Sequence, residues 1–169
     1  GPLMRSMHHI PVDRSAGAHA FDHAVTSLRD GEIVGVFPEA TISQSFELKD
    51  FKTGAVRMAA DAGVPVVPMI TFGGQRLWTK GHKRDMERGA TIALTVGEPL
   101  TFTTDDDPVA ATATLKSAMQ ALYDDTIERY PDPPVPGTWW WPARFGGGAP
   151  TLTEMREREE SERKKRESS

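Results

Sequence analysis

Apolar residues recur every three or four positions in several segments of the chain, which is the spacing of a helix with one buried face. This pattern predicts helices over 17–29, 54–62 and 108–129. Gly63 follows the second of them, where a left-handed glycine often ends a helix. The segment 153–167 has charges at helical spacing and almost nothing apolar, so it predicts a solvated helix or a frayed tail.

Short runs rich in Val and Ile predict strands over 33–37, 64–70 and 91–96. The first run stops at Pro38, and we expect it to be a buried strand that ends in a loop. Helices and strands alternate along the chain, which is the order that builds an α/β domain with right-handed crossovers. The fold class we expect is therefore α/β, with a mostly parallel or mixed sheet flanked by helices.

The 169 residues suffice for about one domain. We expect an α/β domain over 1–130, a surface segment rich in Pro, Gly and Trp over 131–150, and a charged helical or disordered tail over 151–169. Residues 139–141 are three consecutive tryptophans. They either anchor the protein at a membrane interface or cover an edge of the core.

Composition excludes several classes of function. The formal net charge of -4 argues against a nucleic-acid partner, because phosphate neutralisation needs a basic face. The absence of cysteine excludes disulfides, thiolate catalysis and metal sites that use sulfur. No run of 18 apolar residues predicts a membrane span.

Several polar residues follow the run 33–37. This place would be the carboxyl end of a strand, where α/β sheets usually bind ligands. Glu39 and Thr41 lie on this loop, and Lys52 precedes the predicted helix 54–62. A lysine and the N–H groups of a helix start favour an anionic group. The alternative is an ordinary connection with solvated polar residues.

Four segments in order resemble sequence blocks of the glycerolipid acyltransferase family, whose best-known members are the lysophosphatidic acid acyltransferases. Residues 10–14 (I-P-V-D-R) are similar to the second block, and 37–43 (F-P-E-A-T-I-S) to the third, F-P-E-G-T-R-S. Residues 51–54 (F-K-T-G) resemble the F-K-x-G that follows, and 64–69 (V-P-V-V-P-M) the fourth block, V-P-V-V-P-V. The ordered spacing of four blocks is more specific than any one of them.

The resemblance implies an enzyme of phospholipid biosynthesis. Such an enzyme transfers a fatty acyl group from acyl-CoA or acyl carrier protein to the hydroxyl of 1-acylglycerol-3-phosphate (lysophosphatidic acid) or a related lysolipid. By position, Arg14 and Lys52 would hold the acceptor's phosphate, and Glu39 and Thr41 would orient its glycerol hydroxyls. Arginine suits this role because its planar fork pairs with two phosphate oxygens.

The resemblance also implies a setting for the reaction. It implies no metal and no organic cofactor. The implied partners are the lysophospholipid, the acyl donor and a membrane surface, with the protein peripheral at the cytoplasmic face.

The chain departs from the family at the third block. Ala40 stands where the family usually has glycine, and Ile42 where it usually has arginine. The missing arginine would remove one phosphate contact, so the acceptor would be held differently or would be another lysolipid.

The family's first block, N-H-x-x-x-x-D, is expected a few dozen residues before Arg14, which is upstream of the first residue of this sequence. His8 and Asp13 fit the letters H-x-x-x-x-D. We do not interpret them as the catalytic pair, because Asp13 adjoins Arg14 within the second block and Pro11 breaks helical geometry. We therefore expect an N-terminally incomplete sheet with an exposed apolar patch, and no turnover by this chain alone. The alternative function is a catalytically silent module that binds lipid or CoA.

Two other features have ordinary explanations. His19 and His23 have the spacing of a metal-binding pair, but without a third ligand we interpret them as surface residues. The stretch 75–84 is basic and contains one tryptophan, so it contacts the acyl donor or the membrane, or is a polar loop. We expect Arg14, Glu39 and Lys52 to converge on one crevice.

Overall fold

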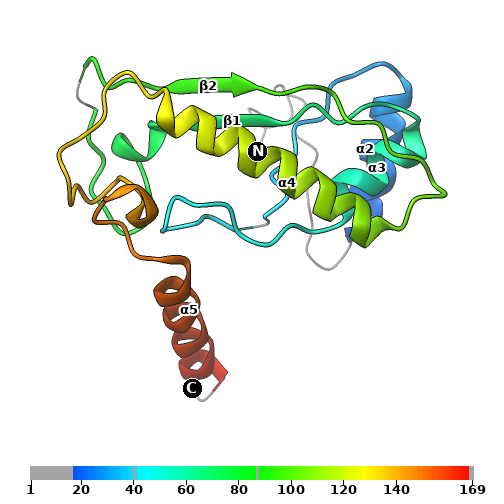
Figure 1. The fold of residues 1–169 in the computed structure, drawn as a ribbon. Coiled ribbons are helices and arrows are strands. Elements are labelled where there is room, and N and C mark those ends of the chain that lie inside the picture. The colour runs from blue at the N-terminus through cyan, green and yellow to red at the C-terminus, as the bar shows by residue number, and fades with distance from the viewer. Residues whose placement is uncertain (1–16, 40, 87, 168–169) are drawn as a thin grey trace. The chain divides into compact units, whose positions relative to one another are not determined.

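The structure is a computed structural model that describes residues 17–39, 41–86 and 88–167 (Figure 1). The chain divides into two compact units. Unit 1 contains the described residues up to Pro38, together with Phe51–Pro68 and Gly97–Met119. Unit 2 contains Glu39–Asp50, Met69–Val96 and the chain from Gln120 onward. The division of the sequence into 1–130, 131–150 and 151–169 stays a prediction.

In unit 1, helices α2 (Gly17–Arg29) and α3 (Gly54–Ala62) pack against each other. Both confirm the predicted bounds. Arg29 ties the two together, because its Nη2 donates to the carbonyl oxygen of Asp61 at 2.7 Å. Gly63 ends α3 in the left-handed conformation, with φ of 70°. The buried apolar side chains of this pair are small: Ala24, Val25, Val56 and Ala59.

The prediction of a buried strand over 33–37 is wrong. These residues are extended but belong to no strand, and Ile33 is 98% exposed while Phe37 is 92% exposed. A strand needs a neighbour that pairs with its backbone, and no described residue pairs with 33–37 as a strand. The only strand-like pairing that unit 1 shows among the described residues is an antiparallel bridge between Val66 and Leu100.

In unit 2, strands β1 (Met69–Phe72) and β2 (Ala93–Val96) form an antiparallel pair, with Met69 opposite Val96. Strand β2 lies within the predicted run 91–96, whereas β1 overlaps the predicted run 64–70 only at residues 69 and 70. The α/β class is confirmed. The parallel pairing that we expect for most of the sheet is not found among the described strands, which form this two-stranded sheet.

The core of unit 2 is aromatic. Phe72 of β1 meets four rings at edge or tilted angles, with centroids 5.4–6.4 Å apart; they belong to Tyr123, Tyr130, Trp140 and Trp141. Helix α4 (Pro108–Glu128) supplies Tyr123, and it confirms the helix predicted over 108–129. Trp140 and Trp141 are 8% and 7% exposed. Of the two interpretations of the tryptophans, covering the core is the one that holds for this pair.

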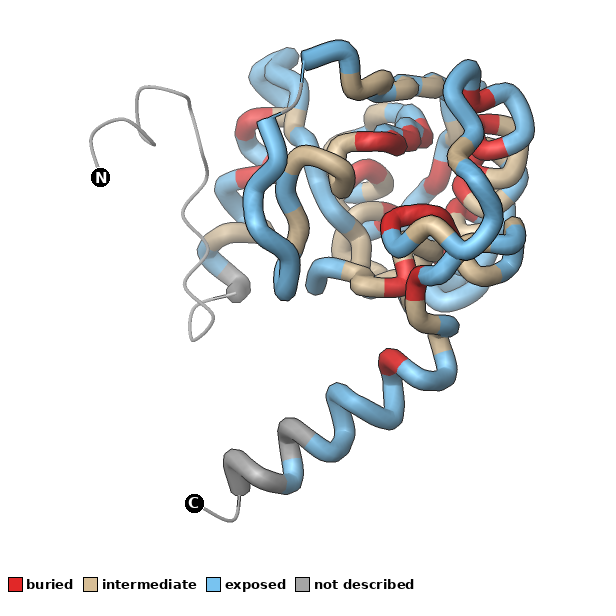
Figure 2. Tube along the Cα trace, turned by 90° about the vertical axis from the view of Figure 1, so that its left-hand side faces the viewer, coloured by how far each residue is buried: buried red, intermediate tan, exposed pale blue. Residues whose placement is uncertain are grey.

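Two short 3-10 helices, η1 (Gly74–Arg76) and η2 (Ala143–Phe145), and helix α5 (Leu152–Glu167) complete unit 2. Thr151 caps α5 through a reciprocal pair of hydrogen bonds with Glu154. The backbone N–H and the hydroxyl of Thr151 both donate to the Glu154 carboxylate and lower its pKa. Figure 2 shows α5 exposed along most of its length, with a buried position near its start, which is Met155. Within the described ranges, no helix combines the length and apolarity needed to cross a bilayer.

Candidate functional site

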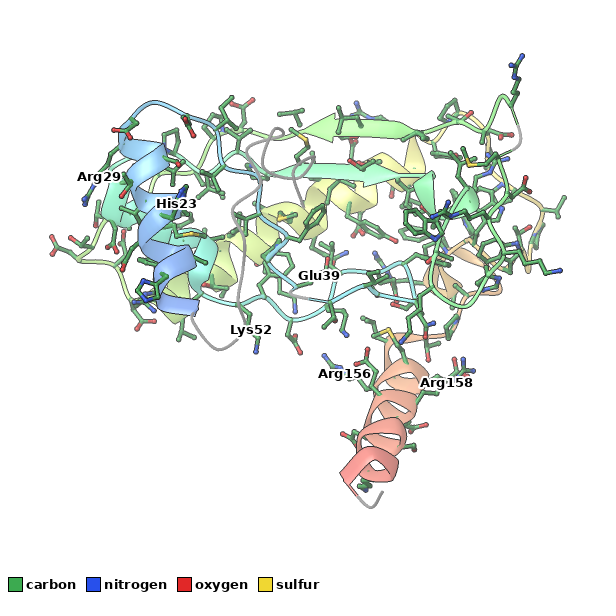
Figure 3. The ribbon with its side chains drawn as sticks, turned by 180° about the vertical axis from the view of Figure 1, so that it is seen from behind. His23, Arg29, Glu39, Lys52, Arg156 and Arg158 are labelled. Atoms are coloured by element: carbon green, nitrogen blue, oxygen red, sulfur yellow. The ribbon has the colours of Figure 1, made fainter. Side chains whose placement is uncertain are left out.

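In the loop 39–50 of unit 2, two of the predicted site residues, Glu39 and Thr41, hydrogen-bond to the same residue, Lys49. The backbone N–H of Lys49 donates to Oε2 of Glu39 at 3.0 Å. The Nζ of the same lysine donates to Oγ1 of Thr41 at 2.8 Å. Lys49 therefore binds Glu39 through its backbone and Thr41 through its side chain (Glu39 is labelled in Figure 3).

The next turn of this loop is also tightly held. Ser45 is fully buried, and its Oγ lies 2.8 Å from Oγ of Ser43 and accepts from the N–H of Glu47. Phe46 adopts a left-handed φ of 59°, which costs a residue with a side chain about 1–2 kcal/mol. The Tyr123 hydroxyl donates to the Phe46 carbonyl at 2.8 Å and so holds this conformation.

Charges at the edge of the loop fix it to the aromatic core of unit 2. The Arg144 guanidinium pairs with Glu47 at 2.9 Å and with Asp124 of α4. Its hydrogen bonds lower the pKa of the Asp124 carboxyl. Burial raises the pKa of the Tyr123 phenol, which keeps this hydroxyl protonated as a donor. The loop conformation is thus set by hydrogen bonds and ion pairs from distant parts of the sequence.

Lys52 lies in unit 1, directly before α3. Its backbone N–H donates to the Pro38 carbonyl at 2.9 Å, and its side chain is exposed (Figure 3). Thr53 is the N-cap residue of α3 but makes no side-chain capping bond. The N–H groups of the first turn and the lysine ammonium are both positive, so this helix start favours an anion.

The four predicted site residues therefore have different outcomes. Glu39 and Thr41 share one partner, Lys49, in unit 2, and Lys52 lies two residues before α3 in unit 1. Arg14 lies outside the described residues, as do His8 and Asp13. The convergence of Arg14, Glu39 and Lys52 stays a prediction.

Sequence reasoning missed the residues that support the loop. Lys49, Arg144 and Asp124 have no motif or spacing that announces them. Tyr123 had a signal, because it continues the apolar stripe of α4 that includes Met119 and Ile127. Its hydroxyl on an otherwise buried stripe indicates a side chain with a fixed hydrogen-bond partner.

The remaining candidate sites are poor fits for phosphate or metal. A hollow of about 270 Å³ at the start of α4 is lined in part by Asp106 and Asp107, whose charges repel phosphate. His19 and His23 lie exposed on α2. In the part of the chain that the structure describes, no group of three or more His, Asp or Glu side chains could hold a metal ion.

The loop 39–50 and α3 lie in the part of the chain that is similar to known acyltransferases. The acyltransferase family model matches residues 1–71. The 1-acyl-sn-glycerol-3-phosphate acyltransferase of Limnanthes douglasii is 36% identical over 88 residues, which are 50% of this chain and 31% of that protein. The enzyme of the same name from Bacillus subtilis is 34% identical over 104 residues, 59% of this chain and 47% of that protein. The chain thus spans less than half the length of either relative.

A solved structure is similar in fold. It is the 1-acyl-sn-glycerophosphate acyltransferase PlsC of Thermotoga maritima, with a TM-score of 0.54 and 23% identity, covering 64% of this chain and 44% of that one. The family match and the relatives agree with the order of blocks in the sequence. The similarity to acyltransferases thus covers residues 1–71 in the family model and 88 to 104 residues in these two relatives.

Proposed function

We propose that the chain is part of a phospholipid-biosynthesis enzyme that acylates 1-acylglycerol-3-phosphate, with acyl-CoA or acyl carrier protein as the donor. The observation that carries the proposal is the third block, in which Lys49 clamps Glu39 and Thr41 into one polar group. Relatives that share this part of the sequence are named for that reaction. The acceptor would be 1-acylglycerol-3-phosphate or a closely related lysolipid.

The chemistry requires a base, a carbonyl and a leaving thiol. The base removes the proton of the acceptor hydroxyl, whose oxygen attacks the thioester carbon. The C–S bond then breaks, and the thiolate of the donor takes up a proton. Glu39 and Thr41 would orient the glycerol hydroxyls, and Lys52 with the start of α3 would bind the phosphate. No step of this scheme calls for a metal or an organic cofactor.

Acceptor binding tests the proposal directly. Isothermal titration of this chain with lysophosphatidic acid, below its micelle concentration, should show saturable binding. Monoacylglycerol, which lacks the phosphate, should bind more weakly. Lys52→Met should remove most of that preference, whereas Arg57→Met, at an exposed basic position within α3, should keep it. Equal affinity for the two lipids would contradict a phosphate site.

The second candidate function is a silent module that binds lipid or CoA. It is kept because the one histidine among the described residues of unit 2, His82, stacks its ring on Trp139 with centroids 3.9 Å apart and is not an evident base. This histidine is therefore engaged in the aromatic surface of unit 2. A positioned base contributes about 10² to 10⁴ in rate, so we expect an assay with acyl-CoA and lysophosphatidic acid to stay near background. Turnover that His8→Ala abolishes would overturn this expectation.

Peripheral membrane contact belongs to the same proposal, at the cytoplasmic face. The loop 77–88 carries four basic and two acidic residues, in a chain of net charge -4. Trp78 is 66% exposed, and the Arg84 guanidinium lies 4.2 Å from its ring centre. Exposed indole and basic charge together suit an anionic lipid surface. Flotation with anionic vesicles should recover the chain, and Trp78→Ser should reduce that recovery.

A further inference from the structure

Helix α5 is fastened to the loop that carries Glu39 and Thr41. The Nζ of Lys49, besides reaching Thr41, forms an ion pair with Glu159 of α5 at 2.8 Å. The Lys49 side chain is only 14% exposed, whereas that of Glu159 is 48% exposed. One half-buried ammonium therefore joins the candidate acceptor site to the C-terminal helix.

Two further contacts join the same segments. Arg156 of α5 pairs with Asp50 at the end of the loop, at 2.8 Å. Met155, buried almost completely, accepts a hydrogen bond from Oγ of Ser43 at 3.8 Å between oxygen and sulfur. Helix α5 therefore contacts the C-terminal end of the loop, at Lys49 and Asp50, and its middle, at Ser43. Figure 3 shows Arg156 and Arg158 on the part of α5 where these contacts begin.

The geometry at Lys49 has a chemical consequence for Thr41. An ammonium has three donors and no acceptor. Because Oγ1 of Thr41 accepts one of them, the threonine hydroxyl keeps its own hydrogen for donation to a second group. The backbone N–H of Lys49 meanwhile fixes the Glu39 carboxylate. The carboxylate and the hydroxyl are thus given a fixed separation and opposite hydrogen-bonding roles.

We propose that Lys49 is a positioning residue of the acceptor site, and that Glu159 of α5 holds it in place. The proposal rests on the proposed function for its ligand but not for its conformational part. Helix α5 lies outside residues 1–71, which the family model matches. One of the many charges of α5, the Glu159 carboxylate, then orients Lys49, and Lys49 in turn orders Glu39 and Thr41.

Hydrogen exchange of the full chain tests the conformational part. Lys49→Met and Glu159→Gln should both accelerate amide exchange within 39–50, the lysine variant more strongly. The matched control is Glu160→Gln, which removes the next glutamate of α5 and should leave exchange within 39–50 unchanged. Exchange as slow in Lys49→Met as in the original chain would overturn the proposal.

Ligand binding tests the positioning part. Lys49→Met should weaken binding of lysophosphatidic acid about tenfold, the effect of losing one hydrogen bond to a charged group. Lys49→Arg keeps the charge and the donors, so it should restore most of the affinity. A merely structural loss would appear instead as a lower denaturation midpoint with unchanged affinity, and this result would contradict the proposal.

The two proposals fail in different ways. If the unaltered chain does not bind lysophosphatidic acid, the proposed acceptor is wrong, and the exchange experiment still decides whether Lys49 and Glu159 order the loop. If the chain binds the lipid and Lys49→Met binds it equally well, the positioning role is wrong while the proposed function stands.

Discussion

Residues 33–37 and 139–141 are both short apolar runs, and they have opposite environments. Ile33 and Phe37 are almost fully exposed, whereas Trp140 and Trp141 are almost fully buried. The first run is rich in β-branched residues and lies beside predicted helices, and the second lies in a segment full of proline and glycine. Local sequence favours the opposite outcome in both cases.

The difference lies in the partners that each run finds. Trp140 and Trp141 are held by Phe72 and by Tyr130, and the indole N–H of Trp141 donates to the Phe145 carbonyl at 3.0 Å. Both rings are therefore packed, and the indole N–H of Trp141 has an acceptor. The run 33–37 finds no strand among the described residues to pair with its backbone. Burial therefore depends on a complementary surface as well as on hydrophobicity.

The largest expected effect is the removal of the ring at the centre of unit 2. Phe72→Ala should destabilise the chain by about 3–5 kcal/mol, because it opens a cavity among four other rings. Phe37→Ala, the same change at an exposed ring, should stay within about 0.5 kcal/mol of the original. Urea denaturation measures both. Similar losses of unfolding free energy in the two variants would contradict the contrast between the buried and the exposed ring.

Adding a methyl group should also have different effects at a glycine beside the aromatic core of unit 2 and at a glycine in the exposed run 33–37. Gly73 has φ of 102°, and a Cβ there would collide with the Thr91 carbonyl and lie 2.8 Å from the Tyr130 hydroxyl. Gly73→Ala should therefore cost about 1–3 kcal/mol. Gly35 has open space around it and no positive φ, so Gly35→Ala should be nearly neutral in the same denaturation experiment.

The ion pairs at the edge of unit 2 should give a smaller, pH-dependent effect. Arg144 lowers the pKa of the Asp124 carboxyl, so this pair stabilises the fold above the ordinary carboxyl pKa of 3.8, and the stabilisation is lost as the pH falls through the lowered value. Arg144→Met should cost up to about 1 kcal/mol at pH 7.

The difference in stability between Arg144→Met and the original chain should become smaller as the pH falls. Thermal unfolding of both proteins from pH 7 to pH 2 would show this. Arg129→Met is the control. Arg129 directly follows α4, and its side chain forms an exposed ion pair with Asp125 of that helix. A gap that stays constant down to the lowest pH would mean that the loss comes from packing of the guanidinium against Phe145.

The smallest effect on stability should come from making the exposed run polar. Ile33→Asp with Phe37→Ser should leave the free energy of unfolding within about 0.5 kcal/mol. The same variant should bind less of an apolar dye and scatter less light, because it removes exposed apolar surface. A clear loss of cooperativity in this variant would show that the run contributes to the fold.

Helix bounds were the most predictable part of this molecule. Helices α2 and α3 match their predicted ranges because apolar spacing and a terminal glycine are local signals. Strand pairing was not predictable, since it depends on residues such as Met69 and Val96 that meet only in the fold. The site was predictable as far as its motif reaches. Glu39 and Thr41 belong to a block, whereas Lys49 acts through a geometry that no spacing encodes.

Chemical-shift mapping tests the central claim most directly, namely that the third block and the start of α3 bind the acceptor. Lysophosphatidic acid is titrated into labelled chain, and the amide resonances of residues 39–54 are followed with those of strand β2 as an internal reference. We predict that Glu39, Thr41 and the first turn of α3 shift in a saturable manner, and that monoacylglycerol leaves the α3 amides unmoved. Shifts confined to other parts of the chain, or none at saturating lipid, would contradict the assignment of this site.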